Sequence, residues 1–166
     1  MAELNLPEWV LDSIDAYTTG ELTTAAKSGY PSTFPVAVAF DRPAGILVTT
    51  TSVGFPAKAA NIRRDPRVGI TMGYTVSSSD SGAGAVHIQG RAEADDRDFD
   101  MNLMSLARYP SLTEIQPGLK RRMRNPRWRK LYQGYLTRVI ITITPERVLA
   151  WRDPECGDEP EVFECR

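Results

Sequence analysis

The chain has 166 residues, of which 42% are hydrophobic and 25% charged, with a formal net charge of −1. This length fits one domain, so we expect a single domain over residues 1–166, with its core in 21–152 and an acidic tail in 153–166. The near-zero charge excludes a general attraction to nucleic acid or anionic membranes. Because no signal-peptide pattern and no apolar run of ~18 residues is found, we expect a cytoplasmic protein without membrane contact.

The chain begins with a helical pattern and then changes to strands. Pro7 can start a helix that carries Trp9, Val10 and Ile14 on one face. Beyond Gly20 the pattern becomes β-rich and predicts three strands, over residues 21–27, 32–40 and 46–51. The second of these is apolar on both faces, which predicts a well-buried strand.

A short helix follows the third strand. Pro56 is a good first residue, residues 57–64 are strong helix formers, and Asp65-Pro66 ends the helix. Further segments follow in order: strands over 68–72 and 85–94 around a Ser/Gly-rich loop at 75–85, helical patterns over 95–108 and 118–135, and β-rich segments over 137–144 and 147–151. Because most connections are short, we expect antiparallel pairing in an α+β protein centred on a small barrel.

The start of the short helix is a candidate phosphate site. N–H groups at a helix start favour an anion, and Lys58 in the first turn adds a full positive charge. Asn61 lies three residues on, on the same helix face. Thr49, Thr50 and Thr51 offer hydroxyls just before it, with Thr50 on the opposite face of the strand from the other two. The alternative is a solvated lysine beside an ordinary helix start.

In their order, these segments resemble the pyridoxamine 5′-phosphate oxidase-like, FMN-binding split-barrel family. The resemblance is carried by ILVTTTS at 46–52, PAKAANIRRDPRV at 56–68 and VHIQGRAEA at 86–94, and it spans roughly 21–94 and 137–151. It implies an α+β, mainly β fold: a six-stranded antiparallel split β-barrel of Greek-key-like topology, with a short central helix and peripheral helices.

The resemblance also implies a function. Family members are homodimers that bind FMN or the deazaflavin F(420) at the subunit interface, which implies a cofactor phosphate near Lys58 and Asn61. The other implied cofactor-binding residues are Val48, Thr49, Thr50, Thr51, Gln89 and Trp151. The flavin ring would exchange hydride with a small organic substrate, so no catalytic residue is named. A non-catalytic flavin-binding or flavin-sequestering protein is the alternative, because the binding residues are shared.

Two departures from the family pattern limit the implied activity. Ala57 stands where pyridoxamine phosphate oxidases have the arginine of Ser-Arg-Lys, and Ala85 stands where they have a flavin-contacting glutamine. Oxidation of vitamin B6 is therefore not expected. Many deazaflavin-binding members have a basic residue just before the lysine, which Pro56-Ala57 lacks. This favours FMN, with F(420) as the alternative.

Three further features have two interpretations each. His87 could be a general base, but an ordinary histidine at the surface or core edge is favoured. The basic segment 120–130 (KRRMRNPRWRK) could contact a polyanion, but the near-zero total charge favours a solvated face. Trp151 is either a plug of the barrel or a wall against the flavin ring. No cysteine or histidine spacing indicates a metal site.

Overall fold

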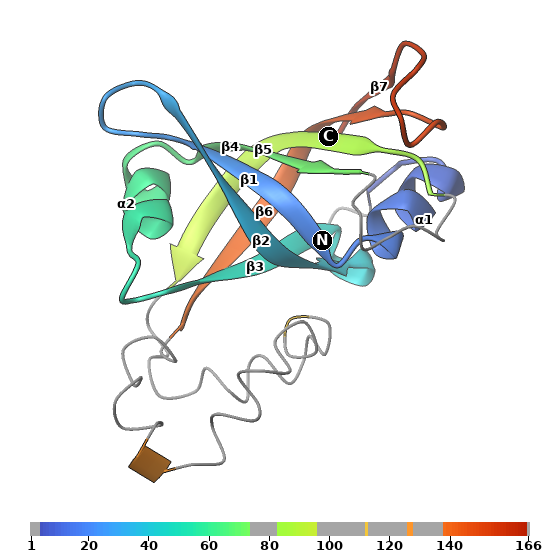
Figure 1. The fold of residues 1–166 in the computed structure, drawn as a ribbon. Coiled ribbons are helices and arrows are strands. Elements are labelled where there is room, and N and C mark those ends of the chain that lie inside the picture. The colour runs from blue at the N-terminus through green and yellow to red at the C-terminus, as the bar shows by residue number, and fades with distance from the viewer. Residues whose placement is uncertain (1–3, 74–82, 96–111, 113–125, 128–137, 166) are drawn as a thin grey trace.

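The computed structural model describes residues 4–73, 83–95, 112, 126–127 and 138–165, which are coloured in Figure 1. Its elements are α1 (Glu8–Ala16), β1 (Thr19–Ala25), β2 (Pro31–Asp41), a short 3₁₀ turn (Arg42–Ala44), β3 (Ile46–Ser52), α2 (Ala57–Arg64), β4 (Arg67–Met72), β5 (Val86–Asp95), β6 (Arg138–Ala150) and β7 (Glu161–Glu164). The predicted helices over 95–108 and 118–135 and most of the predicted loop over 75–85 lie outside the described residues.

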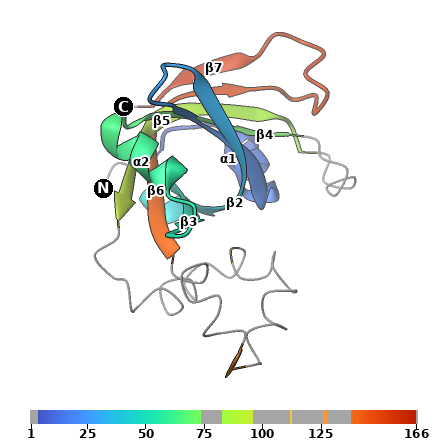
Figure 2. The same cartoon turned by 60° about the vertical axis from the view of Figure 1, so that its left-hand side comes forward.

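Six antiparallel strands close into a barrel, as Figure 2 shows from near its end. The strand order is β3-β2-β1-β4-β5-β6, and pairing between β3 and β6 closes the ring. The first three strands form a meander, after which α2 carries the chain back so that β4 pairs with β1. This order, with the fourth strand beside the first, is a Greek key. The predicted mainly β, six-stranded antiparallel barrel is confirmed.

The interior of the barrel is filled by one side chain in two from each strand, because successive side chains point to opposite faces. The members of this core with no exposed surface include Leu22, Leu47, Ile70, Ile88, Ile141 and Ile143. On β2 only Val36 and Val38 are fully inside, while Phe34 and Phe40 are partly exposed toward the two ends. The predicted burial of both faces of this strand therefore holds only for its middle.

The two helices lie at opposite ends of the barrel (Figure 1). Helix α1 buries Val10 and Ile14 in the core, and α2 buries Ile62 in the same core. Arg42, which follows β2, forms ion pairs with the α1 carboxylates of Glu8, Asp12 and Asp15. Within the described segments, no helix is long and apolar enough to cross a membrane.

Strand β6 differs from the prediction of two β-rich segments. It is one strand of 13 residues, and it pairs along almost its full length with β5. The register shifts once: Gly90 is paired with Pro145, whereas Gln89 is paired with Arg147. The extra residue, Glu146, forms a β-bulge, which lets a proline sit within a strand that continues on both sides of it.

The C-terminal segment also differs from the prediction of a loose tail. Residues Glu161–Glu164 form β7, which pairs with the end of β6 outside the barrel. Phe163 packs edge-on against Trp9 of α1, with ring centroids 6.5 Å apart, and the Arg152 guanidinium lies 4.2 Å from the centre of the Trp9 ring. These apolar and cation–π contacts hold the segment, and an acidic composition alone does not reveal them.

Candidate functional site

The candidate site begins in the turn that joins β3 to α2. The Thr51 hydroxyl donates to the Phe55 carbonyl (3.1 Å), and the Gly54 N–H donates to the Ser52 hydroxyl (3.1 Å). The Phe55 N–H also donates to the Ser52 carbonyl at 3.0 Å. These bonds fix a tight turn, so the start of α2 lies directly beside the end of β3.

The start of α2 retains free capacity for an acceptor. Pro56 occupies the N-cap position, and no side chain caps the helix. N–H groups of a first helical turn have no acceptor within the helix, so they attract an anion. The predicted helix bounds and the position of Lys58 in its first turn are confirmed.

Lys58 is partly buried and has no acidic partner among the residues that the structure describes. Its ammonium lies 5.1 Å from the centre of the Phe34 ring on β2. Burial, and then the positive charge of Arg138, lower the pKa of Lys58 below its usual value. A charge in such surroundings gains from an added anion, since burial and a like charge both oppose it.

The three threonines of β3 divide as strand alternation predicts. Thr49 and Thr51 point inward, and both hydroxyls are already engaged, that of Thr49 with the Ala37 carbonyl at 2.6 Å. Thr50 is partly exposed on the outer face, and its hydroxyl makes no hydrogen bond within the described segments. Val48, also on the outer face, is 2% exposed and packs with Ala39 and Leu112. Thr50 is therefore the available hydroxyl of this strand.

Asn61 has a bonding role inside the protein. It is 8% exposed, and its side-chain N–H donates to the Thr24 hydroxyl on β1 at 2.9 Å. Its carbonyl oxygen accepts from the Arg64 guanidinium at 3.0 Å. The amide thus ties α2 to β1 beside Lys58, while its predicted contact with a cofactor phosphate stays a prediction.

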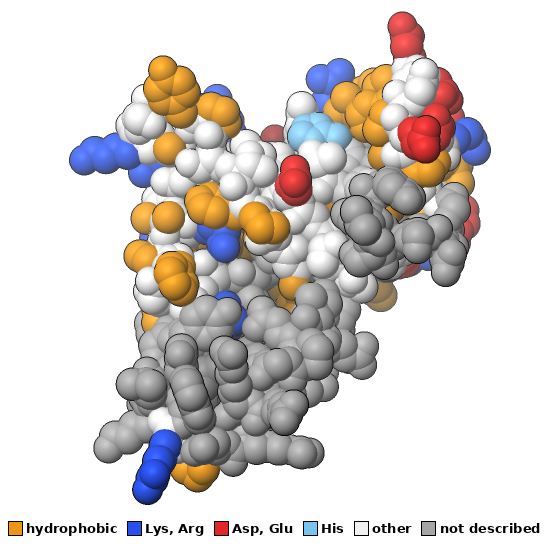
Figure 3. Space-filling model, in the orientation of Figure 1, with side chains coloured by type: hydrophobic (Ala, Val, Ile, Leu, Met, Phe, Trp, Pro, Cys, Tyr) orange, Lys and Arg blue, Asp and Glu red, His pale blue; other side chains and the backbone are white. Residues whose placement is uncertain are grey.

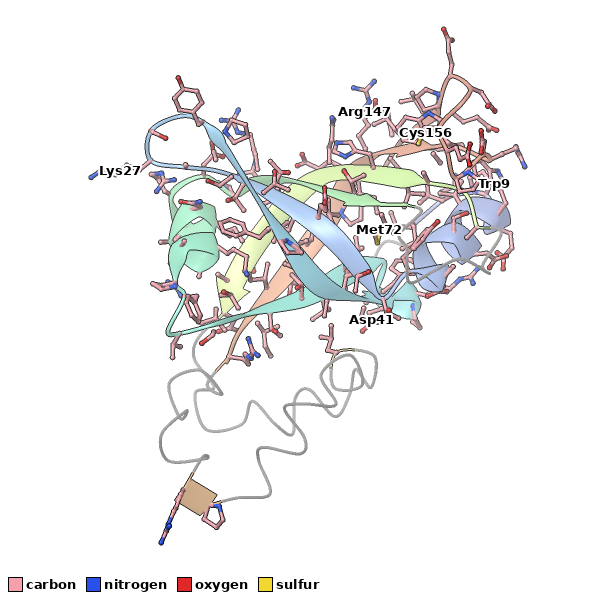
Figure 4. All side chains as sticks on the ribbon, viewed as in Figure 1. Trp9, Lys27, Asp41, Met72, Arg147 and Cys156 are labelled. Atoms are coloured by element: carbon pink, nitrogen blue, oxygen red, sulfur yellow. The ribbon has the colours of Figure 1, made fainter. Side chains whose placement is uncertain are left out.

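Gln89 and Trp151 do not lie with Lys58 in one chain. Gln89 is exposed on β5 and pairs with Arg147 on β6, nine residues along that strand from Arg138. At about 3.3 Å per residue this is roughly 30 Å of strand. Trp151 follows the far end of β6, where its N–H donates to the Ala85 carbonyl at 2.8 Å. In Figure 4, Arg147 marks the Gln89 region, at a distance from α2.

His87 lies on the outer face of β5, two residues from Gln89. Its Nδ1 lies 2.8 Å from the Thr71 hydroxyl on β4. The ring lies over Gly69, where a Cβ would be 3.1 Å from the imidazole Cε1. Burial lowers the pKa of His87, so the ring is neutral at pH 7. A hydrogen-bonded histidine packed on a glycine agrees with the ordinary interpretation more closely than with a general base.

Sequence reasoning did not find Arg138, Phe34 or Phe55 at this site. Arg138 opens β6 and pairs with Ser52 at the end of β3, and Phe55 in the turn is 66% exposed. Figure 3 shows hydrophobic side chains gathered at the α2 end of the barrel, next to basic ones. A cation placed just before the closing strand was the available signal for Arg138, but only the pairing of β3 with β6 gives it meaning.

Two other features lie partly or wholly outside this picture. Of the basic segment 120–130, only residues 126–127 are described, so neither interpretation of it is tested. In the described parts of the chain, no group of three or more His, Cys, Asp or Glu side chains could hold a metal ion.

Comparison with known proteins adds a family and a fold. The family model described as pyridoxamine 5′-phosphate oxidase matches residues 6–152. No curated protein matches the sequence significantly.

Among solved structures, the chain is similar to three proteins at low sequence identity. A heme-binding protein from Mycobacterium smegmatis has a TM-score of 0.58 at 19% identity, over 96% of this chain and 59% of that chain. A protein from Clostridium acetobutylicum, related to general stress protein 26 of Bacillus subtilis, has a TM-score of 0.59 at 9% identity, over 93% and 91%. A FAD-binding protein from Mesorhizobium loti has a TM-score of 0.56 at 18% identity, over 84% and 87%. At such identities the likeness shows the fold alone.

Proposed function

The chain belongs to the pyridoxamine 5′-phosphate oxidase family, and from this premise we propose that it is a flavin-dependent oxidoreductase that exchanges hydride with a small organic substrate. The observation that carries the proposal is Lys58: a partly buried lysine at the uncapped start of α2, without an acidic partner among the described residues. This is the chemistry that a phosphorylated cofactor requires of its site.

The residues at the β3–α2 junction suit the phosphate of FMN or F(420). The Lys58 ammonium, the first N–H groups of α2 and the Thr50 hydroxyl are donors that one phosphate group can use together. When bound, the flavin ring supplies the capacity for hydride transfer. The residues of this chain bind and orient the cofactor, and the exposed Phe55 ring offers apolar surface next to the phosphate site.

The substrate is proposed to be other than pyridoxamine phosphate. Ala57 and Ala85 leave the chain without two side chains that the resemblance assigns to those oxidases. Ala85 is also 3% exposed and packed beside Trp151, so it offers no polar group to a ligand. FMN is the favoured cofactor, with F(420) as the alternative.

The complete site is proposed to need a second copy of the chain. Gln89 and Trp151 are too far along β6 from Lys58 to share its ligand within one protomer. In a two-fold dimer the partner can bring the same residues to Lys58. We place this homodimer in the cytoplasm, without membrane or nucleic-acid partners.

The experiment that tests the proposal identifies the cofactor. Purified protein is denatured, and the released small molecules are analysed by mass spectrometry, alongside titration of the protein with FMN, F(420) and riboflavin. We expect FMN or F(420) to copurify or to bind at micromolar concentration with a shift in the visible spectrum. Failure of both to bind removes the proposal, and a Soret band with copurifying heme would replace the flavin by heme.

A non-catalytic flavin-binding protein is the second candidate, because the donors at Lys58 serve binding as well as catalysis. Reduction of the bound flavin by a hydride donor, followed by reoxidation with a panel of small organic acceptors, separates the two. A bound flavin that no donor or acceptor turns over supports sequestration.

A further inference from the structure

The barrel opens beside the end of β3. Strand β2 pairs with β3 only through Val38–Asp41 against Ile46–Thr49, so the last three residues of β3 are paired on their β6 side alone. Lys58 reaches into this opening, with its ammonium over the Phe34 ring of β2. One side of the β3 end is therefore occupied by a cation.

A second cation lies on the other side of the β3 end. Arg138 is the first residue of β6 and is the register partner of Ser52. Strand alternation puts the Arg138 side chain on the outer face, the face that also carries the Thr50 side chain. Paired residues of antiparallel strands have Cα atoms about 5 Å apart, so the long arginine side chain reaches the β3–α2 turn.

The two cations are close enough to affect each other. The charge of Arg138 is the second cause, after burial, of the lowered pKa of Lys58. Two like charges near one another are unfavourable unless a counter-charge lies between them. Among the described residues no carboxylate is paired with Lys58, whereas Arg42, Arg67, Arg147 and Arg152 each have one. The place between Lys58 and Arg138 is therefore suited to an anion.

We infer that Arg138 is the second cation of the anion site, and that Lys58 and Arg138 together bind the doubly charged phosphate monoester of the cofactor. This inference rests on the proposed function for the identity of the ligand. The guanidinium offers two parallel N–H groups to two phosphate oxygens, while the ammonium acts as a point charge. Thr50 donates between them from the outer face of β3. Riboflavin, which has no phosphate, does not use the pair.

The test measures binding of FMN and riboflavin to Lys58→Ala, Arg138→Ala and Arg138→Lys, each first checked for an unchanged circular dichroism spectrum and thermal midpoint. Arg67→Ala is the matched control, because it removes one positive charge near the end of α2, from a guanidinium already paired with Asp65. We expect Arg138→Ala to weaken FMN binding by about ten- to a hundredfold, as for Lys58→Ala, with riboflavin little changed. Arg138→Lys keeps the charge and recovers part of the loss, and Arg67→Ala binds as the unchanged protein does.

A second measurement does not depend on flavin. The pKa of Lys58 is followed by NMR with inorganic phosphate or chloride at equal ionic strength. We expect phosphate to raise this pKa in the unchanged protein, and Arg138→Ala to raise it without phosphate and to reduce the effect of phosphate.

The outcomes separate the two ideas. If FMN binds and depends on Lys58 but not on Arg138, the inference is overturned and the proposed function stands. If no flavin binds but phosphate shifts the Lys58 pKa through Arg138, the proposed function fails and the paired-cation site stands. If Arg138→Ala does not fold, Arg138→Lys and the phosphate shift decide. Absence of both effects overturns both.

Discussion

At the scale of single residues, Lys58 is the side chain whose removal separates a phosphate site from an ordinary surface lysine. We expect Lys58→Ala to weaken binding of FMN by about 1.5–3 kcal/mol, the usual contribution of a hydrogen bond to a charged group. The uncapped start of α2 still attracts the anion, so binding falls without vanishing. Titration calorimetry with FMN and riboflavin checks this. Equal losses for the two ligands would show that the ammonium is not at the phosphate.

Asn61 is expected to affect stability more than binding. Asn61→Ala leaves the 2%-exposed Thr24 side chain without the donor that now contacts it at 2.9 Å. We expect a loss of about 1–2 kcal/mol in the free energy of unfolding, measured by urea denaturation. Thr24→Val is the matched variant, and a double-mutant cycle should show coupling between the two. A large loss of FMN affinity with unchanged stability would instead return Asn61 to the ligand.

His87 gives the chain a pH dependence of known sign. Burial lowers the pKa of His87, so below pH 6.5 the unfolded chain binds more protons than the folded one. This contribution to stability is fully present above about pH 6.5 and is lost as the pH falls through the lowered value. Urea denaturation between about pH 5 and 7.5 should show it, and His87→Gln should flatten the slope. Identical slopes in the two proteins would contradict the assignment.

At the scale of elements, the bulge in β6 depends on a close approach at Gly90. A Cβ there would lie 2.2 Å from the Thr144 carbonyl oxygen, so Gly90→Ala must push apart two strands of the barrel. We expect a loss of about 1–3 kcal/mol in the free energy of unfolding, the usual cost of overpacking. Gly73→Ala is the control, because its Cβ would lie at an ordinary 3.4 Å from the Ala85 side chain. Equal effects of the two would rule out the steric explanation.

The elements that the sequence predicts well are those with local signals. The alternating strands and α2, between Pro56 and Asp65-Pro66, are found within two residues of their predicted ends. The continuity of β6 was missed because a proline interrupts its pattern, and the bulge that accommodates it depends on pairing with Gly90 of β5. Strand β7 was missed because its contacts with Trp9 and β6 are distant in sequence.

The candidate site divides in the same way. Lys58 and the alternation of the three threonines follow from local spacing, and the structure agrees. That Thr49 is already bonded to Ala37, that Asn61 binds Thr24, and that Arg138 lies beside Ser52 are consequences of how β1, β2 and β6 pair around the barrel. Such contacts join residues 12, 37 and 86 positions apart, which no short motif records.

At the scale of the whole molecule, one barrel presents the candidate cofactor residues in two places. Lys58 and Thr50 lie at the α2 end, and Gln89 lies on the outer face of β5, roughly 30 Å along β6. Ligand sites usually bury about 70–90% of a ligand's surface, which the open β3 end cannot do alone. A two-fold pair, in which each protomer presents Gln89 to the Lys58 of its partner, resolves this at both sites at once.

The proposed dimer can be tested by mixing two defective proteins. Lys58→Ala removes the ammonium, and Gln89→Trp fills the space where Gln89 would face the ring, so each homodimer should bind FMN poorly. In a mixed dimer one site carries both changes and the other carries neither. Random exchange therefore restores FMN binding at about a quarter of all sites if each site is shared between protomers. Light scattering checks that every species is dimeric, and calorimetry after exchange counts the sites. No restoration after verified exchange, or a flavin-bound monomer, would place the whole site within one chain.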